Sequence, residues 1–128
     1  MNLHTLPRAV VGALALLAFS LVATSDAAAP AAKGNAATGK GIYDQKCVSC
    51  HKPDGSGGVP LGTGKTPNWT APATWAEPKR KDRDAYLRAS ITHGNIAKGM
   101  VPFVKSGQLK PAEVEHLIAH INVLAKPK

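Results

Sequence analysis

Cys47-Val48-Ser49-Cys50-His51 is the stretch of this sequence that decides the fold. Two thiols three residues apart, with a histidine directly after the second, are typical of covalent c-type haem attachment. One turn of backbone presents both sulfurs to the two vinyl groups on one edge of a porphyrin. The next residue then lies under the ring, where its imidazole nitrogen reaches the iron as an axial ligand. The motif predicts attachment through Cys47 and Cys50 and iron ligation by His51.

Three other roles of a cysteine pair are open on the motif alone: a disulfide, a thioredoxin-like redox pair and half of a zinc site. A redox pair would need a strand followed by a helix, which no pattern here indicates. A zinc site would need a second pair of ligands, and the chain has no further cysteines. Haem attachment would consume both thiols as thioethers, so the pair predicts nothing about disulfides.

The N-terminus has the three-part pattern of a secretory signal peptide. Arg8 gives the start a positive charge, residues 9–23 are almost entirely small or apolar, and Ser25 and Ala27 are the small residues of a cleavage site. The apolar run of about 15 residues is shorter than the roughly 20 that span a bilayer; a retained signal anchor is the alternative. We expect residues 1–27 to be removed on export to the periplasm, 28–34 to be a flexible leader and 35–128 to be one domain.

The predicted domain is poor in aromatic side chains. The 101 residues left after removal of 1–27 suffice for a single domain, and a chain of this size buries only a limited core. Their aromatic residues are Tyr43, Trp69, Trp75, Tyr86 and Phe103. A bound haem would supply a large apolar surface, so we interpret this scarcity as a core that the cofactor completes.

Three segments have the pattern of helices. Asn35 is a candidate N-cap for a helix over residues 35–47, and Asp82 and Gly94 bound a second helix over 82–93. Pro111 stands in the first turn of the last helix. The apolar residues of that helix recur at helical spacing: Val114, Leu117, Ile118, Ile121 and Leu124. No segment alternates like a strand, so we predict an all-α fold of about three main helices around one haem.

Residues 52–77 are predicted to form a long loop, because they are rich in Gly, Pro, Thr and Asn and have no clear period. A structureless loop of this length is unusual in a small domain unless something orders it. The edge of a haem would do so.

Met100 is the predicted ligand on the other face of the iron, and a gap-filling core methionine is the alternative. It is the only methionine outside the predicted signal peptide, and it lies between two predicted helices. His/Met ligation raises the reduction potential of a haem. The rivals are His93, His116 and His120. His116 and His120 have a metal-ligand spacing, but without a third ligand we interpret them as partly exposed helix histidines, and His93 as a helix C-terminal histidine.

Over residues 34–126, these motifs resemble those of the class I, bacterial-type monohaem cytochromes c. The matching pieces stand in the family's order: Gly39 with Tyr43, the attachment motif, residues 54–58, Pro60, Met100 and residues 109–113. The resemblance implies that Gly39 and Tyr43 cross the last helix. It also implies that the carbonyl of Pro60 accepts a hydrogen bond from His51 and so orients the imidazole, with Pro67 as the other candidate.

Three positions depart from the family pattern. Val101 separates Met100 from Pro102, where the family places the proline directly after the methionine. His120 stands where an aromatic side chain is common, which predicts a more polar contact between the first and last helices. Lys110 replaces the usual cap of the last helix, so we expect its first turn to be weaker.

The predicted mature chain is strongly basic, with 15 Lys/Arg against 7 Asp/Glu. Such a balance favours salt-dependent association with acidic surfaces, although runs such as residues 79–83 are usually solvated faces. We expect acidic redox partner proteins, no nucleic acid, no small-molecule substrate and no stable membrane anchoring.

The sequence thus predicts an electron carrier rather than an enzyme, which moves single electrons between redox partners through a haem held by His51 and Met100. Two alternatives are open. One is a haem c subunit of a larger periplasmic oxidoreductase that oxidises a sulfur compound, sulfite or an alcohol. The other is an open-site haem protein, which requires that Met100 not bind the iron.

Overall fold

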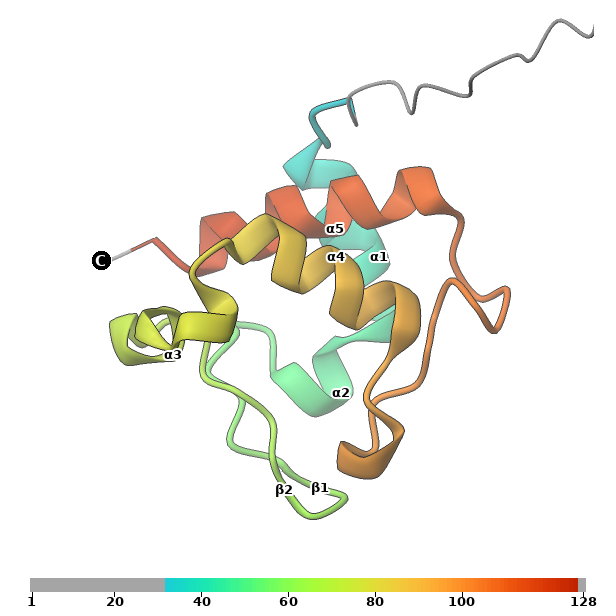
Figure 1. The fold of residues 1–128 in the computed structure, drawn as a ribbon. Coiled ribbons are helices and arrows are strands. Elements are labelled where there is room, and N and C mark those ends of the chain that lie inside the picture. Colours follow the sequence, from blue (N-terminus) through green and yellow to red (C-terminus); the bar gives the residue numbers. More distant parts are fainter. Residues whose placement is uncertain (1–31, 127–128) are drawn as a thin grey trace, which may run out of the picture.

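The computed structural model describes residues 32–126 and folds them mainly into helices (Figure 1). In chain order the elements are α1 (Ala36–Lys46), α2 (Val48–His51), β1 (Pro60–Leu61), β2 (Gly64–Lys65), α3 (Pro72–Ala76), the 3-10 turn η1 (Pro78–Arg80), α4 (Arg83–His93), the 3-10 turn η2 (Ile96–Lys98) and α5 (Pro111–Leu124). The predicted signal peptide lies outside the described residues. Within residues 32–126 no helix is long and apolar enough to span a bilayer.

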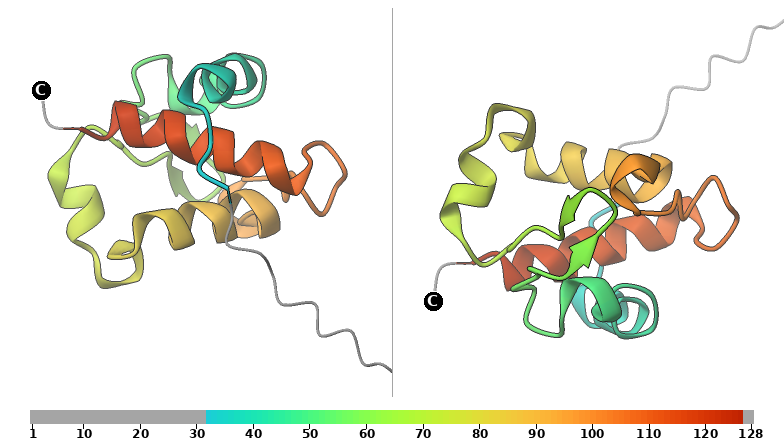
Figure 2. Two further views of the ribbon diagram at one scale, coloured as in Figure 1. Left: turned by 90° about the horizontal axis from the view of Figure 1, so that it is seen from above. Right: turned by 90° about the horizontal axis from the view of Figure 1, so that it is seen from below.

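Helix α5 is the central element of the fold and lies between α1 and α4 (Figure 2). The apolar stripe that the sequence predicts on α5 is buried except for Leu124, which is partly buried, and it meets Tyr43 of α1 and Leu87 and Ile91 of α4 in one core cluster. Burying a side chain of this size stabilises the fold by roughly 1.5–3 kcal/mol. The three predicted helices therefore form, with ends within one residue of those expected from the sequence.

A close backbone contact joins α1 to α5. A Cβ atom added at Gly39 would lie 1.8 Å from the carbonyl oxygen of His116, so no side chain fits between the two helices there. The backbone N–H of Asn35, which caps α1, donates a hydrogen bond to His116 Nδ1 at 2.8 Å. Tyr43, one turn further along α1, is fully buried against α5. Gly39 and Tyr43 thus cross the last helix as the resemblance implies.

Polar side chains also tie α4 to α5. Arg88 donates to both carboxylate oxygens of Glu115, from Nε at 2.7 Å and from Nη2 at 3.0 Å. This hydrogen bonding lowers the pKa of Glu115, so the stabilisation from the pair is present at neutral pH and is lost as the pH falls through the lowered pKa. Asn122 adds a second link, because its amide donates to Asp84 at 2.8 Å.

The helix ends largely follow the sequence signals. The side chains of Asn35 and Asp82 each accept a backbone N–H at 2.9 Å and so cap α1 and α4. The side chain of Lys110 does not cap α5, but the carboxylate of Glu113 accepts the Lys110 N–H at 2.6 Å. This is one half of a capping box. The first turn of α5 therefore keeps one capping hydrogen bond, although Lys110 is not a usual capping residue.

The segment over residues 52–77, which the sequence predicts to be a loop, contains a short hairpin and a short helix. Strands β1 and β2 pair antiparallel, with Pro60 opposite Lys65 and Leu61 opposite Gly64, and α3 follows. Two residues per strand are too few to produce a visible alternation of apolar and polar side chains. Hydrogen bonds within the segment also order it, including one from Trp69 N–H to the carbonyl of Gly55 at 2.8 Å.

We predict opposite effects for two alanine substitutions in α1. Gly39→Ala would place a Cβ against the His116 carbonyl and should destabilise the haem-loaded protein by at least about 1–3 kcal/mol, as overpacking does. Gly41→Ala is the matched control, because nothing lies within 4 Å of its added Cβ, and it should stabilise the helix by roughly 0.5–1 kcal/mol. Denaturant unfolding of both variants measures the difference. Equal effects would contradict the proposed helix contact.

Candidate functional site

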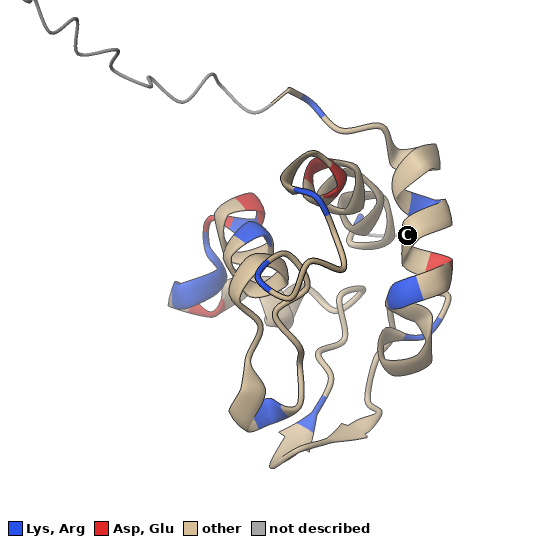
Figure 3. Ribbon diagram, turned by 90° about the vertical axis from the view of Figure 1, so that its right-hand side faces the viewer, with Lys and Arg blue, Asp and Glu red and all other residues tan. Residues whose placement is uncertain are grey.

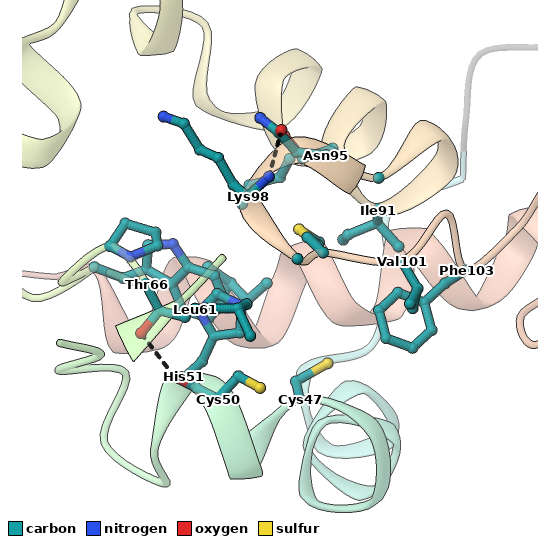
Figure 4. Close-up of a pocket in the computed structure, with 18 of the residues that line it drawn as sticks. Cys47, Cys50, His51, Leu61, Thr66, Ile91, Asn95, Lys98, Val101 and Phe103 are labelled. Atoms are coloured by element: carbon teal, nitrogen blue, oxygen red, sulfur yellow. Dashed lines mark hydrogen bonds between the residues drawn. The ribbon is translucent and has the colours of Figure 1, made fainter. Parts of the chain in front are cut away.

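The attachment motif begins directly where α1 ends. Cys47 closes α1, and α2 then carries Cys50 and His51 on a single turn, with the His51 N–H donating to the Cys47 carbonyl at 2.9 Å. Both cysteines are free thiols, and their sulfurs extend into one cavity (Figure 4). Burial, together with the neighbouring Cys50, raises the pKa of the Cys47 thiol to about 12.

The cavity into which the sulfurs extend has a volume of about 350 Å³. Its walls come from α2, the hairpin, α4, α5 and the segment after α4, and most of them are apolar. The apolar and aromatic side chains that line it include Leu61, Trp69, Leu87, Ile91, Phe103, Leu109, Leu117 and Ile121. An apolar cleft of this size with a few polar groups is typical of a cofactor site.

His51 is buried at the edge of this cavity, with 8% of its surface exposed. Burial lowers the pKa of its imidazole to about 4, so at neutral pH the ring is uncharged and offers a nitrogen lone pair to a metal. The side chain of Thr66 helps to fix the turn, because its hydroxyl donates to the carbonyl of Cys50 at 2.8 Å. The predicted ligand is therefore in the protonation state that iron binding requires.

The hydrogen bond that the resemblance assigns to Pro60 is not formed in the structure. His51 Nδ1 is buried without a hydrogen-bond partner. Pro60 lies exposed in β1, and Pro67, the other candidate, is the proline that lines the cavity. Pro60 is paired with Lys65 in a hairpin that no pattern in the sequence indicates.

The ring contact of His51 is instead with Trp69. The two rings are stacked, with centroids 4.2 Å apart and planes inclined by 11°. Trp69 is almost fully buried and also packs against Tyr43, at a centroid distance of 6.0 Å. From the sequence, Trp69 is only one of a few aromatic residues, because no periodic pattern in the loop indicates which way its side chain points.

Met100 lines the same cavity as His51. A tight turn presents it: the Asn95 N–H donates to the Met100 carbonyl at 2.8 Å and the Met100 N–H donates to the Asn95 carbonyl at 3.0 Å. Gly99, with φ +79°, closes the turn. It packs against the side chain of Leu61 in the hairpin, and the right-hand view of Figure 2 shows the hairpin beside this turn. Two loops far apart in sequence thus support each other at the mouth of the cavity.

The rival histidines do not line the cavity. His93 is exposed at the end of α4, and His116 accepts the N–H of Asn35. His120 is buried rather than partly exposed as predicted. Its ring packs edge-on against Tyr43 at 5.0 Å, in the place of the usual aromatic residue, and its Nε2 has no partner. The contact between the first and last helices thus carries a buried polar ring, as the sequence predicts. Within residues 32–126 no cluster of three or more His, Cys, Asp or Glu side chains forms a metal site.

Basic residues surround the cavity. Five of its lining residues are basic and none is acidic; the basic ones are Lys46, Lys65, Lys79, Arg80 and Lys98. They come from α1, the hairpin, η1 and η2, and Figure 3 shows Lys and Arg positions spread over several elements. The site therefore suits a group that is largely apolar and carries negative charge at its rim.

These residues fit haem c. Cys47 and Cys50 offer two thiols for vinyl groups, His51 a nitrogen and Met100 a sulfur for iron, the apolar walls accommodate a porphyrin, and the basic rim suits its carboxylates. When bound, the haem supplies a one-electron redox couple.

Comparisons with known proteins agree with the geometry. Residues 34–121 match the family described as "Cytochrome C oxidase, cbb3-type, subunit III". Among solved structures, the chain is similar to one described as "KustC0563 c-type cytochrome", with a TM-score of 0.53 and 27% identity, covering 69% of this chain and 98% of that chain. No curated protein matches the sequence. The predicted all-α cytochrome c fold and its haem c are confirmed, and the chain belongs to this family of c-type cytochrome domains, with one iron-containing haem c bound covalently.

Proposed function

We propose that this cytochrome is an exported single-electron carrier whose haem iron is held by His51 on one face and Met100 on the other. The observation that carries the proposal is that His51 and Met100 line one cavity, whereas His93, His116 and His120 do not. Two protein ligands leave the iron no open position for a substrate. The protein then acts as a carrier rather than as an enzyme, because a change of redox state makes and breaks no ligand bond.

The surroundings of the cavity support a role in protein-to-protein electron transfer. The basic residues at its rim favour the approach of an acidic partner, and such steering depends strongly on ionic strength. Ile96 and Val101, on either side of Met100, are 70% and 41% exposed. A small apolar centre with a charged rim is the usual make-up of a transient docking surface.

Export to the periplasm rests on the pattern of residues 1–27. The described domain is consistent with it, because both thiols lie at the haem site, where attachment would consume them. The proposal also includes removal of the signal peptide near Ala27 and an expected absence of nucleic acid, small-molecule substrates and a stable membrane anchor.

A second candidate is a haem subunit of a larger periplasmic oxidoreductase, such as one that oxidises a sulfur compound, sulfite or an alcohol. The matching family is itself described as an oxidase subunit, which favours a place in an assembly. Against this, the large apolar side chains exposed within residues 32–126 are only Ile96, Val101 and Val123, fewer than a permanent interface presents. Purification of the native protein, with its size and companions measured, separates the two candidates.

The covalent attachment of the haem to both cysteines can be tested directly. Acid–organic extraction should leave the haem on the polypeptide, because thioether bonds survive conditions that break iron–ligand bonds. Cys47→Ala and Cys50→Ala should each give at most a protein with one thioether link. A wild-type protein that releases its haem would contradict this assignment.

Met100→Ala tests the second iron ligand. The variant should lose the weak far-red sulfur-to-iron charge-transfer band of the oxidised protein. Its reduction potential should fall, because a thioether favours ferrous iron more than water or hydroxide does. The reduced variant should also bind carbon monoxide readily, which the six-coordinate wild type should resist. Absorption spectroscopy and redox titration measure all three changes.

His93→Ala is the control for this assignment, since His93 is exposed and lies outside the cavity. It should leave the band, the potential and the resistance to carbon monoxide unchanged. Changes in the His93 variant alone would indicate bis-histidine ligation. No change in either variant would favour the open-site alternative.

Charge reversal at the rim tests the predicted steering. Lys98→Glu should slow oxidation of the reduced protein by the anionic complex hexacyanoferrate(III) several-fold at low ionic strength, and high salt should remove much of the difference, because it screens exposed charges. Lys33→Glu makes the same change in net charge away from the cavity, so it should have a much smaller effect. Stopped-flow rates measure both, and equal effects would show that net charge, not the rim, attracts the oxidant.

A further inference from the structure

We propose that Trp69 positions the proximal imidazole by stacking on it, in place of the hydrogen bond that usually orients such a ligand. The inference rests on the proposed ligation of the iron by His51. It concerns how that ligand is held, and therefore how the redox centre is tuned.

The backbone of His51 is fixed from both sides. Its N–H donates to the Cys47 carbonyl at 2.9 Å, and its carbonyl accepts the N–H of Gly57 at 3.2 Å. A fixed backbone does not fix the ring, because the second side-chain torsion of histidine has a broad distribution. The ring needs a further partner, which is usually a carbonyl or carboxylate that accepts its second N–H.

His51 Nδ1 has no such acceptor, although it is buried. Instead, the imidazole of His51 stacks on the ring of Trp69. The two rings are nearly parallel, and their centroids are 4.2 Å apart. A flat partner at this distance opposes rotation of the imidazole, since rotation would separate the two planes. The contact also covers one face of the ring and so keeps water from it.

Trp69 is itself held rigidly enough for this role. Its N–H donates to the carbonyl of Gly55 and its own carbonyl accepts the indole N–H of Trp75, both at 2.8 Å. On another side its ring meets Tyr43, whose hydroxyl donates to the carbonyl of Lys52 at 2.6 Å. The stacking partner therefore belongs to the hydrogen-bonded framework of the loop.

An imidazole oriented by stacking differs chemically from one oriented by a hydrogen bond. An acceptor at Nδ1 would draw the proton away and raise the basicity of the ligand, which favours ferric iron. The aromatic face of Trp69 accepts no such hydrogen bond, so it does not raise the basicity of the ligand. Loss of the face should let the ring turn and let water reach it, so the reduction potential should fall.

The experiment compares three variants of the full, haem-loaded protein. Trp69→Leu removes the flat face, Trp69→Phe keeps a smaller one, and Val114→Ala shortens a buried side chain of α5 that does not line the cavity. The haem-methyl hyperfine shifts of the ferric protein report the plane of the axial imidazole. Redox titration and thermal unfolding complete the measurements.

Trp69→Leu should change the pattern of the haem-methyl shifts and lower the potential, and Trp69→Phe should lie closer to the wild type on both measures. Val114→Ala should lower thermal stability, because it leaves a small cavity in the core, and should leave the pattern and the potential unchanged. A Leu variant that is less stable but keeps the wild-type pattern overturns the proposal. A Phe variant as perturbed as the Leu variant also does so. If the Leu variant yields no haem-loaded protein, Trp69→Met takes its place.

The wild-type spectrum separates this inference from the proposed function. A low-spin ferric haem that His51→Ala abolishes establishes His51 as a ligand, and unchanged shifts in Trp69→Leu then refute the stacking role alone. A wild-type protein without such a haem refutes the ligation itself, and the inference with it.

Discussion

The backbone contact between α1 and α5 at Gly39 is the constraint on which the rest of the structure depends. The attachment motif follows α1 with no intervening loop, so the position of α1 on α5 decides where both thiols and the imidazole lie. Helix α4 packs on α5 from the other side, and the turn that bears Met100 follows α4 directly. The two predicted iron ligands reach one cavity because α1 and α4 both pack on α5. A side chain at Gly39 would push α1, and with it the attachment motif, away from α5.

The parts of this design that could be predicted from the sequence are those with local signals. Asn35, Asp82 and Pro111 mark helix starts, and the spacing of Val114 to Leu124 marks the buried face of α5. The cysteine motif indicates its cofactor by the spacing of the two thiols and the histidine that follows them, and Met100 is singled out by being the only methionine in the predicted domain. The caps, the apolar spacing and the cysteine motif each act over no more than a few helical turns, which is the range that a single sequence makes visible.

The parts that could not be predicted depend on contacts between distant segments. Nothing near Pro60 indicates that it will lie in a two-residue strand opposite Lys65, or that His51 Nδ1 will have no partner. The stacking of Trp69 on His51 depends on a loop path that hydrogen bonds to Gly55 and Trp75 determine. His120 is predicted to be partly exposed, yet the close approach of α1 buries it against Tyr43. Loop geometry and helix contacts, rather than composition, decide these three positions.

The histidines that lie outside the cavity have a consequence for how this protein reaches its folded state. Thioether bonds keep the haem tethered to the chain when the helices are undone, so the iron remains within reach of His93, His116 and His120 at a high effective concentration. Uncharged imidazole is a good ligand for ferric iron at neutral pH, and the folded structure alone keeps these rings away from it. If Met100 is the second ligand, as we propose, refolding must then displace a wrongly bound histidine before Met100 can bind the iron. We expect this step to slow refolding at neutral pH and to disappear in mild acid, where free histidines are protonated.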